Sequence, residues 1–282
     1  MKQKSKIGLA LGAGASRGFA HIGVLDVLKE NGIKPDYIAG SSIGSIIGAL
    51  YATGMTPKMM EGIAENLNTS LYDVGFSRRG FLRGNRVNEL MKLLTKDQEF
   101  KDLDIPLAVT AVDLITSERV IIQEGKVYQG VRASISIPGV FQPVEVGDKV
   151  LIDGGILERV PVNVVRKMGA DIVIGVDVAF HGLHRPPVNF IETIIQTMEV
   201  MELEIIRHTI PTGDIIIKPD VELSNPLSLD NVSAAVEAGR EATRAVIDEI
   251  KELLNNSCHS EFIEESGQER SFAYAQDGIE KY

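Results

Sequence analysis

The stretch that decides the fold is Gly40-Ser41-Ser42-Ile43-Gly44, which follows an apolar run ending at Ala39 and precedes a helix-forming segment. Strand, tight turn and helix in this order are typical of the elbow that presents a nucleophilic serine. The turn needs glycine at both ends, because a side chain at Gly40 or Gly44 would collide with the neighbouring strand or helix. The pattern therefore predicts Ser42 as a nucleophile, although Gly and Ser recur in ordinary turns as well.

Composition indicates the class of protein. The chain has 282 residues, 44% of them hydrophobic and 24% charged, which is typical of a soluble globular domain. None of its apolar runs reaches the ~20 residues of a membrane-spanning helix. A basic start followed by Ile7–Leu11 is similar to a secretory signal, but the glycines from Gly12 onward interrupt it. The only cysteine, Cys258, can form no internal disulfide and favours a reducing compartment. We expect a cytoplasmic protein that can associate peripherally with a membrane.

Charge separates the body of the chain from its end. A net charge of −10 argues against a nucleic-acid partner, because contacts to phosphates dominate that kind of binding. Residues 255–282 carry six acidic side chains against two basic ones and show no sustained apolar period. We therefore expect an α/β domain over residues 1–254 and an acidic, disordered tail over residues 255–282.

Strands and helices alternate closely in the first half of the chain, which predicts parallel βαβ units and a mainly parallel sheet. The expected strands are 7–11, 36–39, 105–112, 119–123, 150–152, 172–178 and 215–217. The expected helices are 18–30, 43–53, 55–71, 85–94, 190–207 and 233–254. Residues 72–84, rich in Gly and Arg, are expected to form a loop.

A second glycine-rich loop, Gly12–Gly18, joins the first strand to the first helix. Its backbone N–H groups, at the positive end of a helix dipole, suit a phosphate or a developing oxyanion. A dinucleotide site needs G-x-G-x-x-G, but the third glycine comes one place late, and no acid follows the second strand. A P-loop needs Gly-Lys-Ser/Thr, which is missing. Because carboxyl ends of neighbouring parallel strands share one edge, this loop should face Ser42, as an oxyanion hole faces a nucleophile.

Ser42 needs a group that takes its proton. Each of the five histidines has an ordinary structural explanation in its sequence position: His21, His181, His184, His208 and His259. Asp153 is the better candidate, because it ends the apolar run Val150–Ile152 and is expected at the same sheet edge as the two loops. The glycines after it would let a substrate approach, although an Asp-Gly turn alone is the simpler explanation. As a base, Asp153 would need burial, since the unperturbed pKa of an aspartate is about 3.9.

These three motifs, in this order, resemble the patatin-like phospholipase family, and its compact bacterial members in particular, over roughly residues 7–178. Further likenesses are Val-Arg-Ala-Ser at 131–134, Ile-Pro-Gly-Val-Phe-Gln-Pro at 137–143, Pro161-Val162 and Gly169-Ala170-Asp171. One departure is Ala13, where many members have glycine, which makes the loop slightly less open. The resemblance implies a three-layer α/β/α sandwich that needs no metal or other cofactor.

The resemblance also implies a serine lipid acyl hydrolase of the phospholipase A, lysophospholipase or carboxylesterase type. In it Ser42 would be the nucleophile and Asp153 the base. The implied oxyanion hole comprises Gly12, Ala13, Gly14, Ala15, Arg17 and Gly18. The glycines of the elbow are Gly40 and Gly44, and those of the base motif are Gly154 and Gly155. The expected partners are a lipid or acyl-ester substrate and, transiently, a membrane surface, while the oligomeric state stays open.

Two other functions compete with hydrolysis. A non-catalytic or regulatory lipid-binding module on the same fold is the main alternative, and the complete set of motifs argues against it. A nucleotide-binding protein is disfavoured by the late third glycine.

Three further features have a functional and a structural explanation each. Ser77–Arg86, with four arginines, would be a lid over anionic lipid headgroups or a solvated loop, and we favour the loop. The apolar stripe of residues 190–207 would line an acyl channel or form core, and we favour core. Asp113, at the end of a strand, would point into the site or form a turn.

Overall fold

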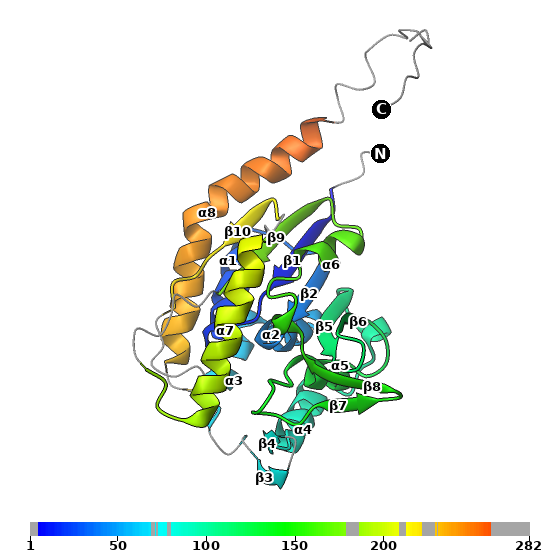
Figure 1. Ribbon diagram of the computed structural model, residues 1–282. Coiled ribbons are helices and arrows are strands. Elements are labelled where there is room, and N and C mark those ends of the chain that lie inside the picture. Colours follow the sequence, from blue (N-terminus) through cyan, green and yellow to red (C-terminus); the bar gives the residue numbers. More distant parts are fainter. Residues whose placement is uncertain are drawn as a thin grey trace, which may run out of the picture.

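The computed structural model describes residues 5–68, 71, 73–77, 80–178, 186–208, 213–221, 229 and 231–260. Its centre is one mainly parallel sheet with the strand order β10-β9-β1-β2-β5-β8-β7, and β6 pairs with β5 (Figure 1). The strands of this sheet are β1 Ile7–Leu11, β2 Tyr37–Ser41, β5 Leu107–Asp113, β6 Glu118–Ile122, β7 Val144–Val146, β8 Lys149–Asp153, β9 Ile172–Val176 and β10 Ile215–Ile217. β3 Val74–Ser77 and β4 Gly80–Leu82 form a separate hairpin.

Helices surround the sheet. The α-helices are α1 Ala20–Glu30, α2 Ile43–Ala52, α3 Pro57–Glu65, α4 Asn85–Leu94, α5 Val127–Ser134, α6 Val162–Lys167, α7 Phe190–His208 and α8 Val232–Ser260. The 3₁₀ turns are η1 Ala15–Phe19, η3 Phe100–Asp102 and η4 Gly154–Ile156. Among the described residues, no helix combines the length and the apolar character needed to cross a bilayer.

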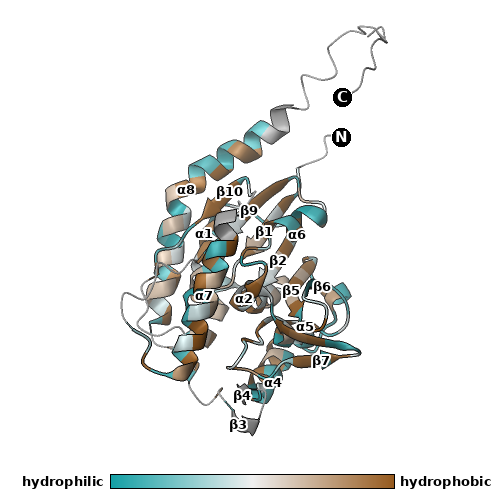
Figure 2. Ribbon diagram, in the orientation of Figure 1, coloured by the Kyte–Doolittle hydropathy of each residue, from teal (hydrophilic) through white to brown (hydrophobic). Residues whose placement is uncertain are grey.

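The two faces of the sheet carry side chains of different size. Large residues of the central strands, such as Leu9 and Ile38, pack with α1, α2 and α8 in the main core. Alternate residues on the other face, such as Ala10 and Ala39, are small and pack with α6. Side chains alternate between the faces of a strand, so apolar residues lie on both faces of the sheet, and the central strands β1 and β9 are brown to white in Figure 2, whereas α8 alternates between brown and teal. Helices on both faces give the expected three-layer α/β/α sandwich.

The strand that ends at Asp153 differs from the expectation. β8 runs antiparallel to β5, so its carboxyl end enters the sheet rather than joining the edge where the parallel strands end. The strand register still places Asp153 beside Ser42 along β5. Asp153 pairs with Ala111 of β5, and Ser41, which precedes Ser42, pairs with the preceding residue Thr110. Ser42 and Asp153 therefore flank β5 at the same height. An antiparallel strand can follow a short connection, whereas the expected parallel one needs a crossover.

Several other boundaries differ as well. The helix expected over 18–30 begins with the 3₁₀ turn η1, and the helix expected over 55–71 is the shorter α3. Residues 72–84, expected as a loop, contain the hairpin of β3 and β4. α8 was expected to end at Leu254 and continues to Ser260. The rest of the expected tail, residues 261–282, lies outside the described residues.

Candidate active site

Ser42 stands in a strained turn between β2 and α2. Its backbone has φ 52° and ψ −124°, a positive φ that is rare for a residue with a side chain. Its N–H donates to Ser134 Oγ at 3.0 Å, and its carbonyl accepts from Ser45 Oγ at 2.6 Å. Strain of this kind persists only where the surroundings hold it, and it is concentrated at functional sites. The local sequence therefore forms the elbow that its pattern predicted.

The elbow glycines allow a close approach of backbones. A Cβ built on Gly44 would lie 2.2 Å from the carbonyl oxygen of Leu11 in β1, and one built on Gly40 would lie 2.5 Å from the carbonyl oxygen of Gly44. Real Cβ atoms essentially never come so near to other atoms. A side chain at either position would thus push α2 away from the sheet and displace Ser42.

Asp153 lies within hydrogen-bonding distance of Ser42. Ser42 Oγ donates to Asp153 Oδ2 at 2.6 Å, and the two residues are only 5% and 4% exposed. Burial raises the pKa of Asp153 to about 6, although the hydrogen bonds from Ser42 and from the Gly155 N–H act in the opposite direction. A general base works best when its pKa lies near the working pH. The burial that the sequence analysis required of Asp153 is present, and it raises the pKa of this carboxyl in that direction.

The backbone around Asp153 fixes the direction of its carboxylate. Its N–H donates to the carbonyl of Ser136 at 3.0 Å, and its Oδ1 accepts from the N–H of Gly155 at 2.8 Å. Gly154 packs against β5, because a Cβ there would lie 2.3 Å from the Thr110 carbonyl oxygen. Oδ2 is thereby left for Ser42.

The glycine loop faces Ser42, but only part of it has free donors. The Gly12 N–H donates to the backbone carbonyl of Val176 at 3.0 Å, and the Ala13 N–H donates to the backbone carbonyl of Arg159 at 2.8 Å, so both amides already have partners within the fold. The first bond within η1 runs from the Arg17 N–H to the Gly14 carbonyl. The amides of Gly14 and Ala15 precede that bond, where a helix end leaves N–H groups without intrahelical partners.

Two other members of the expected oxyanion hole have different contacts. Arg17 is buried, and its guanidinium pairs with Glu199 of α7. Gly18 lets η1 approach the elbow helix, since a Cβ there would lie 2.2 Å from the side chain of Ile43. The structure therefore narrows the candidate donors to Gly14 and Ala15.

His21 supports the loop rather than the chemistry. Burial lowers the pKa of its ring to about 4, so the ring is neutral, and its Nε2 lies 2.9 Å from the Gly12 carbonyl oxygen. A neutral imidazole facing a carbonyl donates its proton to it. This agrees with the structural role expected for His21. His208 is the last residue of α7, and His181 and His184 lie outside the described residues.

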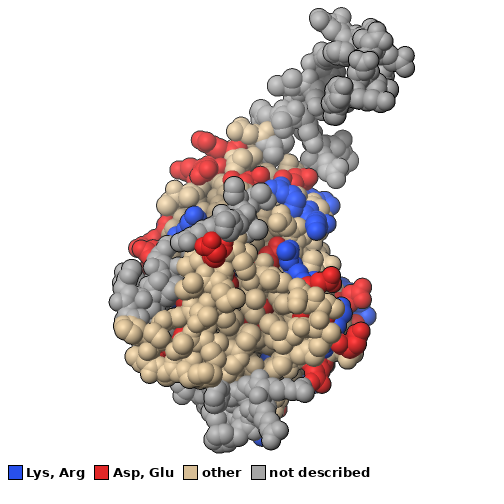
Figure 3. Space-filling model, in the orientation of Figure 1, with Lys and Arg blue, Asp and Glu red and all other residues tan. Residues whose placement is uncertain are grey.

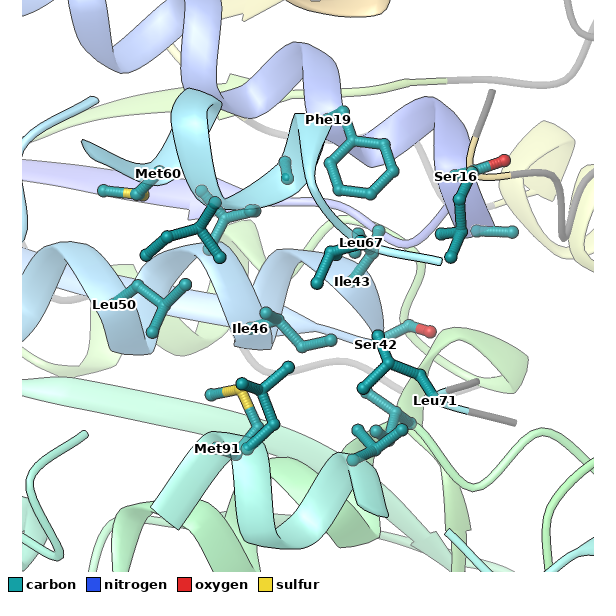
Figure 4. A pocket seen from close by; sticks show the side chains of 18 of the residues that line it. Ser16, Phe19, Ser42, Ile43, Ile46, Leu50, Met60, Leu67, Leu71 and Met91 are labelled. Atoms are coloured by element: carbon teal, nitrogen blue, oxygen red, sulfur yellow. The ribbon is translucent and has the colours of Figure 1, made fainter. Parts of the chain in front are cut away.

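A deep apolar pocket begins at Ser42. Its volume is about 160 Å³, and of its 22 lining residues all but Ser16 and Ser42 are apolar. Figure 4 shows the two serines at one end and Met60 and Leu50 at the other. The walls include residues of α2, α3 and α4, whereas α7, for which the sequence favours core over an acyl channel, contributes none of the described lining residues.

A second, smaller cavity of about 40 Å³ also reaches Ser42 and Asp153, and α7 forms one side of it with Ile195, Met198, Glu199 and Glu202. Burial raises the pKa of Glu202 to about 8, with Arg159 acting against the shift and Asp153 adding to it. Sequence reasoning missed these carboxylates. The signal was available: acidic residues 199 and 202 recur at helical spacing on the same stripe as the apolar residues 195 and 198.

The remaining sequence candidates have structural roles where they are described. Asp113 is the turn residue, with Oδ1 accepting from the N–H groups of Ile115 and Val150. In the arginine-rich segment Leu82 is buried, while Arg78 and Arg79 lie outside the described residues. Within the described ranges no group of three or more His, Cys, Asp or Glu side chains could hold a metal ion.

Comparison with known sequences points to one family. The model of the family described as "Patatin-like phospholipase" matches residues 9–166, more than half of the chain. An uncharacterized NTE family protein of Mycobacterium bovis is 31% identical over an alignment of 278 residues that covers 88% of this chain and 47% of the relative. Lysophospholipase NTE1 of Scheffersomyces stipitis is 32% identical over an alignment of 196 residues that covers 67% of this chain and 12% of the relative. The chain thus spans about half or less of the length of these curated relatives.

Solved structures support the fold. VipD from Legionella pneumophila superposes with a TM-score of 0.57 at 15% identity, covering 88% of this chain and 67% of VipD. The type III effector ExoU from Pseudomonas aeruginosa gives a TM-score of 0.50 at 12% identity, covering 87% of this chain and 53% of ExoU. Fold, ordered motifs and sequence matches agree, and this chain belongs to the patatin-like phospholipase family.

Proposed function

We propose that this protein is a serine hydrolase that cleaves fatty acyl esters of lipids with Ser42 as nucleophile and Asp153 as base. One observation carries the proposal: the 2.6 Å hydrogen bond from Ser42 Oγ to a buried carboxylate lies at the mouth of a deep apolar pocket. The dyad supplies the chemistry of acyl transfer, and the pocket supplies a site for a hydrocarbon chain.

In the acylation step Asp153 Oδ2 takes the proton of Ser42 as Oγ attacks the acyl carbonyl carbon. The carbonyl oxygen becomes an oxyanion, which the amides of Gly14 and Ala15 would stabilise from the start of η1. When the tetrahedral intermediate collapses, the bond to the leaving alcohol breaks and Asp153 returns the proton to the alcohol oxygen. Ser42 then carries the acyl group as an ester.

The apolar pocket would bind the acyl chain of the substrate. With the carbonyl at Ser42, an acyl chain would extend between α2, α3 and α4 toward Leu50 and Met60 (Figure 4). Burial of methylene groups contributes about 0.8 kcal/mol each, so chain length should govern affinity.

The outer surface suits a lipid aggregate. Phe190, Val200 and Met201 of α7 are large apolar residues that are exposed to solvent. Figure 3 shows a broad area with few charged side chains in the centre and lower part of the face on which α7 lies. Large apolar side chains that are exposed in an area with few charges mark interaction surfaces, which supports transient contact with a membrane.

The site favours catalysis over the alternative of a lipid-binding module. Binding alone requires neither a strained φ at Ser42 nor a buried carboxylate on its hydroxyl, and burying a charge lowers stability. Features that oppose folding are retained where chemistry uses them.

A panel of acyl esters tests the proposal. Purified protein should hydrolyse lysophospholipids or p-nitrophenyl esters, and activity should peak at one chain length. Met60→Phe should move the optimum to shorter chains, because Met60 is 1% exposed and lines the far end of the pocket. Met59→Phe is the matched control, since its neighbour Met59 is 57% exposed. Folded wild-type protein that hydrolyses no ester would contradict the proposal.

A further inference from the structure

The small cavity beside Ser42 differs in kind from the apolar pocket. The two share only Ala15, Ser42 and Ile137 among their lining residues, so they meet at the nucleophile and extend away from it separately. The small cavity measures about 40 Å³, which exceeds the roughly 10–15 Å³ that a single water needs.

Two carboxyl groups of α7, together with a nearby arginine, make this cavity suitable for water. Glu199 is 7% exposed, and its Oε2, buried beside the cavity, accepts no hydrogen bond from the described residues. Glu202 lines the same space, and its Oε2 lies 3.8 Å from Arg159 Nη1, which donates no hydrogen bond among the described residues either. A water needs two to four polar partners, and these side chains provide them.

Asp153 and Glu202 lie close together beside Gly155. A Cβ built on Gly155 would lie 2.7 Å from Ala13 Cβ, 3.1 Å from Asp153 Oδ1 and 3.6 Å from Glu202 Oε1. Both carboxyl groups also line the small cavity that reaches Ser42. A small molecule held in this cavity by Glu202 would therefore be next to Asp153 as well.

We infer that this cavity is the acceptor subsite of the enzyme, in which Glu199 and Glu202 hold the water that hydrolyses the acyl-enzyme. The inference rests on the proposed function and adds to it the residues that position the second nucleophile. Acyl group and water then reach Ser42 through separate spaces, so a long chain in the apolar pocket does not block deacylation.

The deacylation step balances with the groups present. The water oxygen attacks the acyl carbon, and Asp153 takes one of its protons. The bond from that carbon to Ser42 Oγ breaks, and Asp153 gives the proton to Oγ. The products are a free fatty acid and the regenerated serine. Glu202, whose pKa of about 8 keeps it neutral at pH 7, orients the water and exchanges no proton with it.

Burst kinetics with a p-nitrophenyl ester separate the two steps, because the first p-nitrophenolate reports acylation and steady turnover reports deacylation. Glu202→Leu should slow deacylation about tenfold, which is the effect expected from losing one hydrogen bond to the water. The burst should persist, and intact-mass analysis should show that acyl-Ser42 accumulates. Glu202→Gln, with a polar end of the same size, should give an intermediate rate. Glu204→Gln, on the exposed side of the same helix, should match wild type.

Met198→Phe gives a second route that leaves every charge in place, since its larger ring should fill the cavity and slow deacylation as well. Accumulated acyl-Ser42 in Glu202→Leu or Met198→Phe supports the inference. Turnover that falls without accumulation in both variants, or that stays at the wild-type value, would overturn it. Wild type that releases no p-nitrophenolate would overturn the proposed function and the inference together.

Discussion

The turn after β2 and the turn after β8 each present a reactive side chain next to glycine, yet they hold it differently. Ser42 has a positive φ of 52°, whereas Asp153 has φ −51° and ψ 133°, which lie in ordinary extended backbone. Ser42 follows a strand that is parallel to both neighbours, and Asp153 ends one that is antiparallel to its neighbours. The proposed nucleophile is placed by local strain, and the proposed base is placed by pairing with a distant strand.

The difference has a physical reason. A nucleophile must project from the backbone toward a substrate, and a tight strand–helix turn achieves that within five residues. A base needs only to lie beside the nucleophile and to be buried. Pairing with Ala111 gives Asp153 its level, and the surrounding protein raises its pKa to about 6. The two turns should therefore respond differently to substitution.

The largest effect is expected at the strained turn. Ser42→Ala removes the nucleophile and should lower kcat/KM for a lysophospholipid or p-nitrophenyl ester by at least about 10⁴-fold, as for other covalent catalysts. Intact-mass analysis should show no acyl adduct. Activity within tenfold of wild type would mean that the covalent bond forms elsewhere.

The base should give a smaller loss with a distinct pH signature. Asp153→Asn keeps the shape but not the proton acceptor, and should reduce kcat/KM by about 10³-fold. In wild type kcat/KM should rise through about pH 6 and then level off, because Asp153 acts only when ionised. A profile without an inflection between pH 5 and 7 would show that another group takes the proton.

The same substitution should increase stability. The folded carboxyl keeps its proton up to about pH 6, and an unfolded one loses it near 3.8, so wild type loses stability as the pH rises between these values. The loss amounts to about 3 kcal/mol at most. Asp153→Asn should therefore unfold at higher urea than wild type at pH 8 and show a smaller advantage at pH 4. An unchanged midpoint at pH 8 would indicate that burial of this charge is not destabilising.

Substitutions of glycine test how closely each of the two turns packs against its neighbouring strand. Gly44→Ala and Gly154→Ala should each destabilise the fold by about 2–3 kcal/mol, because the new Cβ meets a backbone oxygen at 2.2 or 2.3 Å. Gly62→Ala is the control, since Gly62 is an exposed residue in α3 with nothing within 4 Å, and should stabilise by about 0.5–1 kcal/mol. Equal midpoints of urea unfolding for all three variants would contradict the packing at both turns.

The contrast also explains what the sequence could predict. The elbow, the glycine loop and the apolar strands depend on residues that are contiguous in the sequence, and the structure forms them close to the expected positions. The antiparallel direction of β8 depends on which strand it pairs with, which local pattern does not encode. The sequence places Glu199 and Glu202 on the apolar stripe of α7, but only packing reveals that α7 turns this stripe toward Ser42.

The central claim is that Asp153 activates Ser42, and the pH dependence of covalent labelling by a fluorophosphonate probe tests it most directly. The second-order rate constant of wild type should rise through about pH 6, and peptide mapping should place the adduct on Ser42. Asp153→Asn should label Ser42 far more slowly and without that inflection, and Ser42→Ala should not label. Labelling of Asp153→Asn at the wild-type rate and with the wild-type pH profile would contradict the account.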